Sequence, residues 1–176
     1  MLLFIFFIFI ILVFGTMIWA GFSAAPWLPS WKKDIATVLN QAKIQPGDTV
    51  FDLGCGDGRW LIAVAKNTQA KKIVGFEISL LMYLWSRINL LFINYPQIQI
   101  KYKNFFQADF SSADVILCFL TPRAMKKLAP KFDKEMISGA KLISYAFSLP
   151  GREPQKIARF SQKSIPVYLY SFWFYH

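Results

Sequence analysis

The stretch VFDLGCGDGR, residues 50–59, decides the fold. An apolar run that ends in Asp52 comes first, and helix-forming residues follow from Arg59. Between them lie three alternating glycines: Gly54, Gly56 and Gly58. This order predicts a buried strand, a tight turn and then a helix. Because glycines let the backbone approach a ligand closely, and because amides at a helix start point outward, we expect a ligand-binding loop here.

The spacing of the glycines argues against a dinucleotide site. The fingerprint G-x-G-x-x-G needs a glycine at position 59, where Arg59 stands. The carboxylate of Asp52 would also repel a pyrophosphate, whereas it suits a ligand that carries an ammonium group. A second apolar run, residues 72–76, ends at Glu77, where a carboxylate can accept hydrogen bonds from ribose hydroxyls. A structural glycine turn in an unrelated α/β protein is the alternative.

Apolar runs and helical segments alternate along the rest of the chain. The predicted strands cover 49–53, 72–77, 98–103, 115–120 and 141–147, and two aromatic-rich segments, 157–160 and 167–175, predict a closing hairpin. The predicted helices cover 31–42, 59–66, 79–94 and 124–132. Strands that alternate with helices form parallel βαβ units, so the expected fold class is α/β with helices on both sheet faces.

The N-terminal segment differs from the remainder. The 176-residue chain is 55% hydrophobic with a net charge of +10, yet its first charged side chain is Lys32. The apolar run 1–22, as a helix, rises about 33 Å, close to the ~30 Å hydrocarbon core of a bilayer. We therefore expect a transmembrane anchor at 1–25, a linker at 26–30 and one domain at 31–176. A cleaved signal peptide is the alternative, and the absence of a basic n-region disfavours it.

The residues after the apolar run predict an orientation. Trp27, Trp31, Lys32 and Lys33 are of the types found at a membrane interface, and the positive-inside rule places the domain in the bacterial cytoplasm or, if mitochondrial, in the matrix. The bilayer is therefore an expected partner, and the scattered basic residues favour anionic headgroups over nucleic acid. The second apolar segment, 79–94, carries an arginine in its middle, which favours a buried or membrane-leaning helix over a second span.

The motif D-x-G-x-G-x-G at 52–58, with Glu77 at the end of the next strand, resembles the class I S-adenosylmethionine-dependent methyltransferases. A narrower similarity, over about residues 29–151, is to the membrane-anchored mitochondrial protein-lysine methyltransferases of the ATP synthase c-subunit and adenine nucleotide translocase, and to their prokaryotic relatives. It rests on DLGCGDGR, VGFEIS, the helix with Trp85-Ser86-Arg87, and FSLPG. The resemblance implies a Rossmann-like, mostly parallel seven-stranded sheet in the order 3-2-1-4-5-7-6.

The resemblance also implies a cofactor, S-adenosyl-L-methionine, and the residues that bind it. Asp52 would hold the methionine part, Glu77 the ribose hydroxyls, and Ile78 would lie against the adenine. Asn104 would bind the adenine amino group, beside an apolar wall from Phe105 or Phe106, and plain core packing is the alternative for both phenylalanines. The expected cofactor residues are Asp52, Gly54, Cys55, Gly56, Gly58, Glu77, Ile78, Asn104 and Phe105. Cys55 would serve as a small loop residue, where the family usually has serine.

The expected function is methyl transfer to lysine side chains of a membrane-associated protein. Such a transfer needs positioning of the acceptor, and no catalytic residue or metal ligand set is assigned. Residues 120–123, LTPR, lack the Asn/Asp-Pro-Pro-aromatic motif of nucleobase methyltransferases, which counts against DNA or RNA as substrate. Two alternatives stay open: a lipid-soluble acceptor such as a quinone or lipid headgroup, and a non-catalytic assembly factor with this fold.

Overall fold

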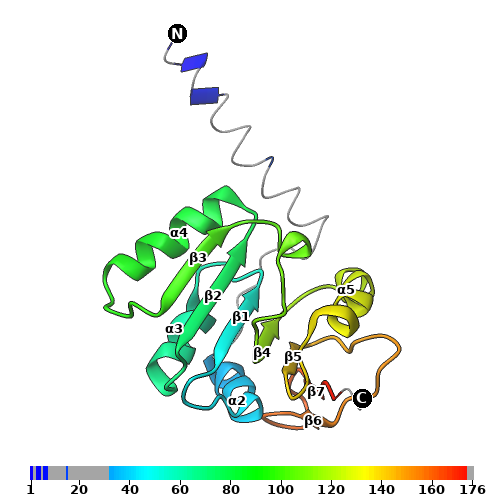
Figure 1. Ribbon diagram of the computed structural model, residues 1–176. Coiled ribbons are helices and arrows are strands. Elements are labelled where there is room, and N and C mark those ends of the chain that lie inside the picture. Colours follow the sequence, from blue (N-terminus) through cyan, green and yellow to red (C-terminus); the bar gives the residue numbers. More distant parts are fainter. Residues whose placement is uncertain (2, 5, 8–14, 16–31, 174–176) are drawn as a thin grey trace.

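A central sheet with helices on both faces forms the domain, as seen in a computed structural model that describes residues 1, 3–4, 6–7, 15 and 32–173 (Figure 1). The strands are β1 (Thr49–Leu53), β2 (Lys72–Glu77), β3 (Ile98–Tyr102), β4 (Val115–Cys118), β5 (Lys141–Tyr145), β6 (Lys156–Ala158) and β7 (Val167–Ser171). The helices are α2 (Lys32–Ala42), α3 (Arg59–Asn67), α4 (Leu80–Leu91), the 3-10 turn η1 (Phe105–Gln107) and α5 (Pro122–Glu135).

The strand order confirms the expected topology. Within the described residues, seven strands pair in the order β3-β2-β1-β4-β5-β7-β6. The first five strands in this order run parallel to one another, and β7 runs antiparallel to both β5 and β6. The chain therefore builds outward from β1 in one direction, then returns to place β4 on the other side of β1. That reversal creates a switch point between the ends of β1 and β4, where ligands of open α/β sheets bind.

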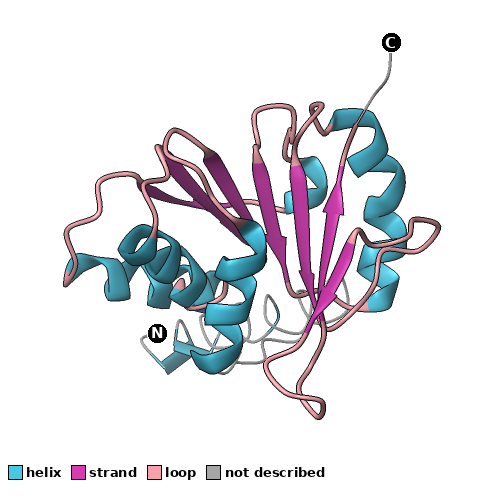
Figure 2. Ribbon diagram, turned by 90° about the horizontal axis from the view of Figure 1, so that it is seen from below, coloured by secondary structure: helices cyan, strands magenta, loops and turns pink. Residues whose placement is uncertain are grey.

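Each face of the sheet has its own apolar core, because side chains alternate along a buried strand. Val50 of β1 packs in a cluster with residues of α2 and α3, whereas its neighbour Phe51 packs in a second cluster with η1 and α5. Helix α4 covers the β3 side of the first face, and Tyr83 and Leu90 contact that cluster. Figure 2 shows these helix layers on the two sides of the twisted sheet.

Several element ends differ from the predicted ones for local reasons. Helix α5 begins at Pro122, two residues before the predicted start, since proline suits the first helical turn and Thr121 caps it by accepting a hydrogen bond from the Ala124 amide. Strands β4 and β5 end two residues early, because the chain turns there into loops at the site. Ala146, directly after β5, has a φ of 77°. The turn η1 carried no periodic signal and was not predicted.

The predicted anchor, 1–25, and the predicted linker, 26–30, lie almost wholly outside the described residues. Among the residues that are described, no helix is long and apolar enough to cross a membrane. Helix α4, the second apolar segment, has 12 residues and packs on the sheet.

Candidate cofactor site

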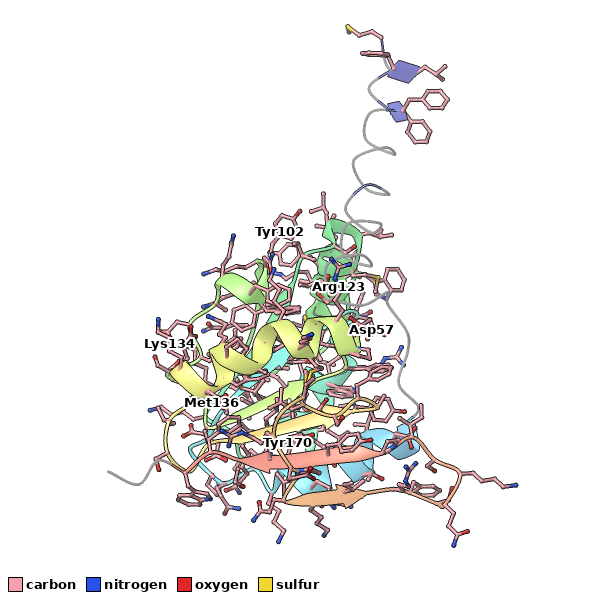
Figure 3. All side chains as sticks on the ribbon, turned by 90° about the vertical axis from the view of Figure 1, so that its right-hand side faces the viewer. Asp57, Tyr102, Arg123, Lys134, Met136 and Tyr170 are labelled. Atoms are coloured by element: carbon pink, nitrogen blue, oxygen red, sulfur yellow. The ribbon has the colours of Figure 1, made fainter. Side chains whose placement is uncertain are left out.

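The glycine loop lies at the switch point of the sheet. It leaves the end of β1, and a Cβ placed on Gly54 would stand 3.6 Å from Cδ2 of Leu120, which follows β4. The loop thus lies at the carboxyl ends of β1 and β4, where the crevice that binds ligands in open α/β sheets is expected. Figure 3 shows Asp57 of this loop and Arg123 of α5 toward the same end of the domain, away from Tyr170.

The loop needs its glycines because its backbone is left-handed at all three of them. The φ angles are 82° at Gly54, 53° at Gly56 and 81° at Gly58, a region that other residues seldom adopt. The amides of Gly54 and Cys55 both donate to the carbonyl of Phe76, at 2.9 and 3.0 Å, and tie the loop to β2. The first turn of α3 follows at once, so its amides are held close to the crevice.

Glu77 joins the loop to the end of β2. Its Oε2 accepts a hydrogen bond from the Gly56 amide at 2.9 Å, and its Oε1 accepts from the amides of Ile78 and Ser79 at 2.8 and 2.7 Å. A carboxylate offers about four accepting positions, so one position on Oε2 is left for a ligand hydroxyl. Burial raises the pKa of Glu77, and the three amides oppose this rise.

Asp52 is a buried carboxyl that has no ion-pair partner among the described residues. Its side chain is 3% exposed, and no hydrogen bond reaches it from the described part of the chain. Burial, with the nearby carboxylates of Glu77 and Asp57, raises the pKa of Asp52 to about 8. A cationic group placed here would stabilise the ionised carboxylate. Asp52 and Glu77 together therefore fit a ligand with both an ammonium group and a ribose, as S-adenosyl-L-methionine has.

Gly75 is a site residue that the sequence reasoning missed. It lies in the interior of β2, and an added Cβ would stand 2.6 Å from Cδ1 of Leu61 and 2.7 Å from Sγ of Cys55. The absence of a side chain at position 75 thus lets the loop and α3 approach the sheet. A glycine inside the predicted strand KIVGFE was the available signal, since such a glycine often marks a close approach of another segment.

Replacing Gly75 with alanine should therefore lower the free energy of unfolding by roughly 1–3 kcal/mol, as overpacking of a core does. Chemical denaturation measures this loss. The companion change Cys55→Ala removes one of the clashing atoms and should recover part of it in the double variant. Equal losses in the single and double variants would contradict the proposed role of Cys55 as the small residue that fits against Gly75.

The remaining predicted residues lie along the next two strand ends. Ile78 is half-buried after β2. Asn104 follows β3, and its Oδ1 accepts from the Phe106 amide at 3.0 Å, which caps η1. Phe105 is 3% exposed and packs in the core beneath this turn, where it contacts Phe106. The structure thus brings Asn104 to the crevice edge, while Phe105 lies deeper than an open wall would.

An aromatic group packs at the ends of β4 and β5, with Phe119 directly after β4, Tyr145 as the last residue of β5 and Trp60 in α3. Tyr145 and Trp60 are buried, and Phe119 is half-buried. Phe119 meets Tyr145 edge-to-face at 4.8 Å, and Trp60 meets the same tyrosine at 6.0 Å. The Tyr145 hydroxyl donates to Oδ2 of Asp34 in α2 at 2.7 Å, and burial raises the pKa of this tyrosine. These residues were not predicted for the site, because their spacing in the sequence carries no motif.

The cysteines are reduced and buried. Burial and the carboxylates of Asp52 and Glu77 raise the pKa of Cys55 well above its usual range, and burial raises that of Cys118 to about 12. Both thiols are therefore protonated at neutral pH, which is unlike a nucleophile. Within the described residues, no cluster of three or more metal-ligating side chains occurs.

A mostly parallel sheet of this order, with a glycine loop at its switch point, defines the Rossmann-like fold of class I S-adenosyl-L-methionine-dependent methyltransferases. Solved structures agree with this class. An RNA methyltransferase from Salinibacter ruber, in complex with S-adenosyl-L-homocysteine, superposes with a TM-score of 0.77 at 26% identity, over 82% of this chain and 93% of its own. An O-methyltransferase from Thermotoga maritima, at 11% identity and a TM-score of 0.67, shares the fold over 85% and 68%.

The chain belongs to the ANTKMT methyltransferase domain family, whose model matches residues 52–156. It is 34% identical over 153 residues to a protein-lysine N-methyltransferase of Saccharolobus islandicus, which covers 82% of this chain and 92% of that protein. A human enzyme, the lysine N-methyltransferase of the ATP synthase c-subunit, is 26% identical over 75% of this chain, which spans only 56% of the human protein. The protein is therefore an S-adenosyl-L-methionine-dependent methyltransferase.

Proposed function

We propose that this protein is a membrane-anchored methyltransferase that modifies lysine side chains of a membrane-associated protein. The observation that carries the lysine assignment is the 34% identity to a protein-lysine N-methyltransferase over most of both chains. The absence of an Asn/Asp-Pro-Pro-aromatic motif after β4 supports a protein acceptor over a nucleobase. Thr121, at that place, instead caps helix α5.

The proposed cofactor contacts follow the geometry of the crevice. The Asp52 carboxylate pairs with the ammonium of the methionine part, beside the backbone of Gly54, Cys55, Gly56 and Gly58. The free position on Oε2 of Glu77 accepts from a ribose hydroxyl. Ile78 and Asn104 border the adenine, and Phe105 supports that border from the core.

The proposed acceptor channel runs past Phe119, the half-buried aromatic residue that follows β4. A bound S-adenosyl-L-methionine supplies an electrophilic methyl group, and the chain has to present an uncharged amine to it. Phe119, which is half-buried and packs on Tyr145, attracts a lysine ammonium through its ring and then places apolar surface beside it, which lowers the pKa of the amine. The proton then leaves to solvent, so a dedicated base is not required and positioning dominates the rate.

The proposal places the domain on the cytoplasmic side of a bacterial membrane, or on the matrix side in a mitochondrion. Its support is the uncharged run before Lys32, the interfacial residues that follow it, and a net charge of +10 carried by the remaining residues. A quinone or lipid headgroup is the rival acceptor in this location.

Deleting residues 1–25 should release the protein from membranes and leave cofactor affinity nearly unchanged, because the proposed cofactor contacts begin at Asp52. Sedimentation with membranes and calorimetric titration with S-adenosyl-L-homocysteine measure the two quantities. A variant that loses cofactor binding would show that the N-terminal segment is part of the fold rather than an anchor.

The acceptor is tested by incubating the full-length protein and tritium-labelled cofactor with membranes, and then separating protein, lipid and RNA. Label in protein, mapped to lysine by mass spectrometry, is the expected result. Label in the lipid fraction would favour the quinone or headgroup acceptor. Label in RNA would match the activity named for the Salinibacter structure and contradict the proposal. A protein without cofactor binding would support the non-catalytic alternative.

A further inference from the structure

The face of α4 that points away from the sheet is apolar along its whole length. The exposed residues of this face, called here the α4 surface, are Leu81, Leu84, Trp85, Ile88, Leu91 and Phe92. Successive members are three, one, three, three and one residues apart, which places them on one stripe of the helix. Trp85 is 53% exposed and Phe92 83%, values that soluble domains rarely combine in one continuous apolar patch.

The opposite face of α4 is fixed against the cofactor loop. Ser86 is fully buried, and its Cβ lies 3.5 Å from the position of a Cβ placed on Gly58. The Asn89 side chain donates to the carbonyl of Asp57 at 3.0 Å. These contacts with the loop fix the rotation of α4 about its axis. The α4 surface, on the opposite side of the helix, therefore faces outward.

The surroundings of the α4 surface are cationic. No aspartate or glutamate occurs between Glu77 and Asp109, whereas Arg87, Lys101 and Lys103 do. Arg87 is the only charged residue of α4 and lies at the edge of the stripe. It lines a hollow of about 500 Å³ together with Lys101 and Leu91. An apolar stripe flanked by cations is complementary to a bilayer with anionic headgroups.

An exposed tyrosine lies beside α4 at the end of the sheet. Tyr102, half-exposed at the end of β3, contacts Tyr83 on the sheet-facing side of α4, with ring centroids 5.5 Å apart and the rings tilted by 45°. Figure 3 shows Tyr102 at the same end of the domain as Arg123. Tyrosine and tryptophan are the residues that concentrate at the headgroup level of membranes.

We propose that the α4 surface lies in the interface of an anionic bilayer and holds the cofactor crevice at the membrane; this inference rests on the membrane location proposed above. Two other binding partners of the α4 surface fit less well. The segment 1–22 is apolar all round, so packing on α4 would leave its other side in water. A second copy would bring Arg87 and its neighbouring lysines close to the same cations of the partner.

The test places a fluorescent label on the full-length protein in vesicles of equal parts phosphatidylcholine and phosphatidylglycerol, with or without brominated acyl chains. Leu84→Cys and Ile88→Cys report on the α4 surface, and Ser112→Cys, exposed before β4, is the matched control. The native Cys55 and Cys118 are buried, so labelling is selective. Brominated lipid should quench the labels at 84 and 88 and leave the label at 112 unaffected.

Two further arms identify the contact. Quenching at 84 and 88 should fall in vesicles of phosphatidylcholine alone, and also in an Arg87→Gln, Lys101→Gln double variant. Labels at 84 and 88 that acrylamide reaches as readily as the label at 112 would overturn the proposal. Labels shielded from acrylamide but not quenched by bromine would also overturn it, because a protein segment would then cover α4.

The same vesicles separate this inference from the proposed function. Cofactor titration and lysine methylation are measured on the unlabelled protein in parallel. Intact methylation with unquenched labels overturns only the placement of α4. Absence of methylation from protein, with quenched labels, overturns the proposed function and leaves the membrane contact standing.

Discussion

Replacing Asp52 with asparagine is expected to stabilise the cofactor-free domain above neutral pH and to weaken cofactor binding. The pKa of Asp52 is about 8 in the folded protein against an ordinary value of 3.8. Between these two values the folded chain holds a proton that the unfolded chain has released, so the free energy of unfolding falls as the pH rises. The neutral asparagine escapes this loss, and the variant should gain on the order of a few kcal/mol at pH 8.

The gain should be small near pH 4 and grow toward pH 8, which thermal or chemical unfolding at several pH values measures. Asp109→Asn is the control with the opposite sign. Hydrogen bonds from the Ser111 amide and hydroxyl lower the pKa of Asp109, so this exposed carboxylate adds stability above its ordinary pKa and loses it as the pH falls. If the gain in the free energy of unfolding of Asp52→Asn did not depend on pH, the raised pKa of Asp52 would be contradicted.

Cofactor affinity should respond in the other direction. Loss of a charge-assisted pair should weaken binding of S-adenosyl-L-methionine roughly 10- to 100-fold in Asp52→Asn. In the unaltered protein the affinity should rise with pH up to about 8, because the cation binds the ionised carboxylate. Calorimetric titration should find this rise absent from the variant. Unchanged affinity would place the ammonium group away from Asp52.

Replacing Glu77 with alanine is expected to weaken cofactor binding about 100-fold or more. The ribose contact accounts for roughly 1.5–3 kcal/mol, and the Gly56 amide loses the acceptor that holds the loop. Glu135→Ala is the matched control, since Glu135 also accepts from a backbone amide, that of Phe110 at 3.1 Å, but lies at the far end of α5. Glu135→Ala should change the free energy of unfolding and leave cofactor affinity unchanged. Equal cofactor affinity in the two variants would show that Glu77 does not bind the ribose.

The glycine stretch and strand alternation made the sheet and its loop predictable. Asp52 and Glu77 were placed correctly at the ends of β1 and β2, because parallel strands bring their carboxyl ends to one edge. Gly75 was missed because its requirement comes from Leu61 and Cys55, which approach it only in the folded chain. Tyr145 was missed for a similar reason: its partner Asp34 lies 111 residues away.

The helix that periodicity assigned least well, α4, illustrates what a local pattern cannot decide. Apolar residues on nearly every side agree with a buried helix, a membrane span or a surface helix alike. Only the contacts of Ser86 and Asn89 with the loop settle which side faces the sheet. The predicted strands β4 and β5 were each two residues too long, because tertiary contacts, which a local pattern does not show, shape the loops that follow them.

The hydrogen bond between Tyr145 and Asp34 has a consequence for substrate choice. Asp34 lies in the first turn of α2, so this bond joins the first described helix of the domain to the end of β5, where Tyr145 contacts Phe119. Five linker residues span at most about 18 Å. The enzyme would then work at a fixed height above the bilayer, and a lysine would be selected by its distance from the lipid surface as much as by its neighbours in sequence.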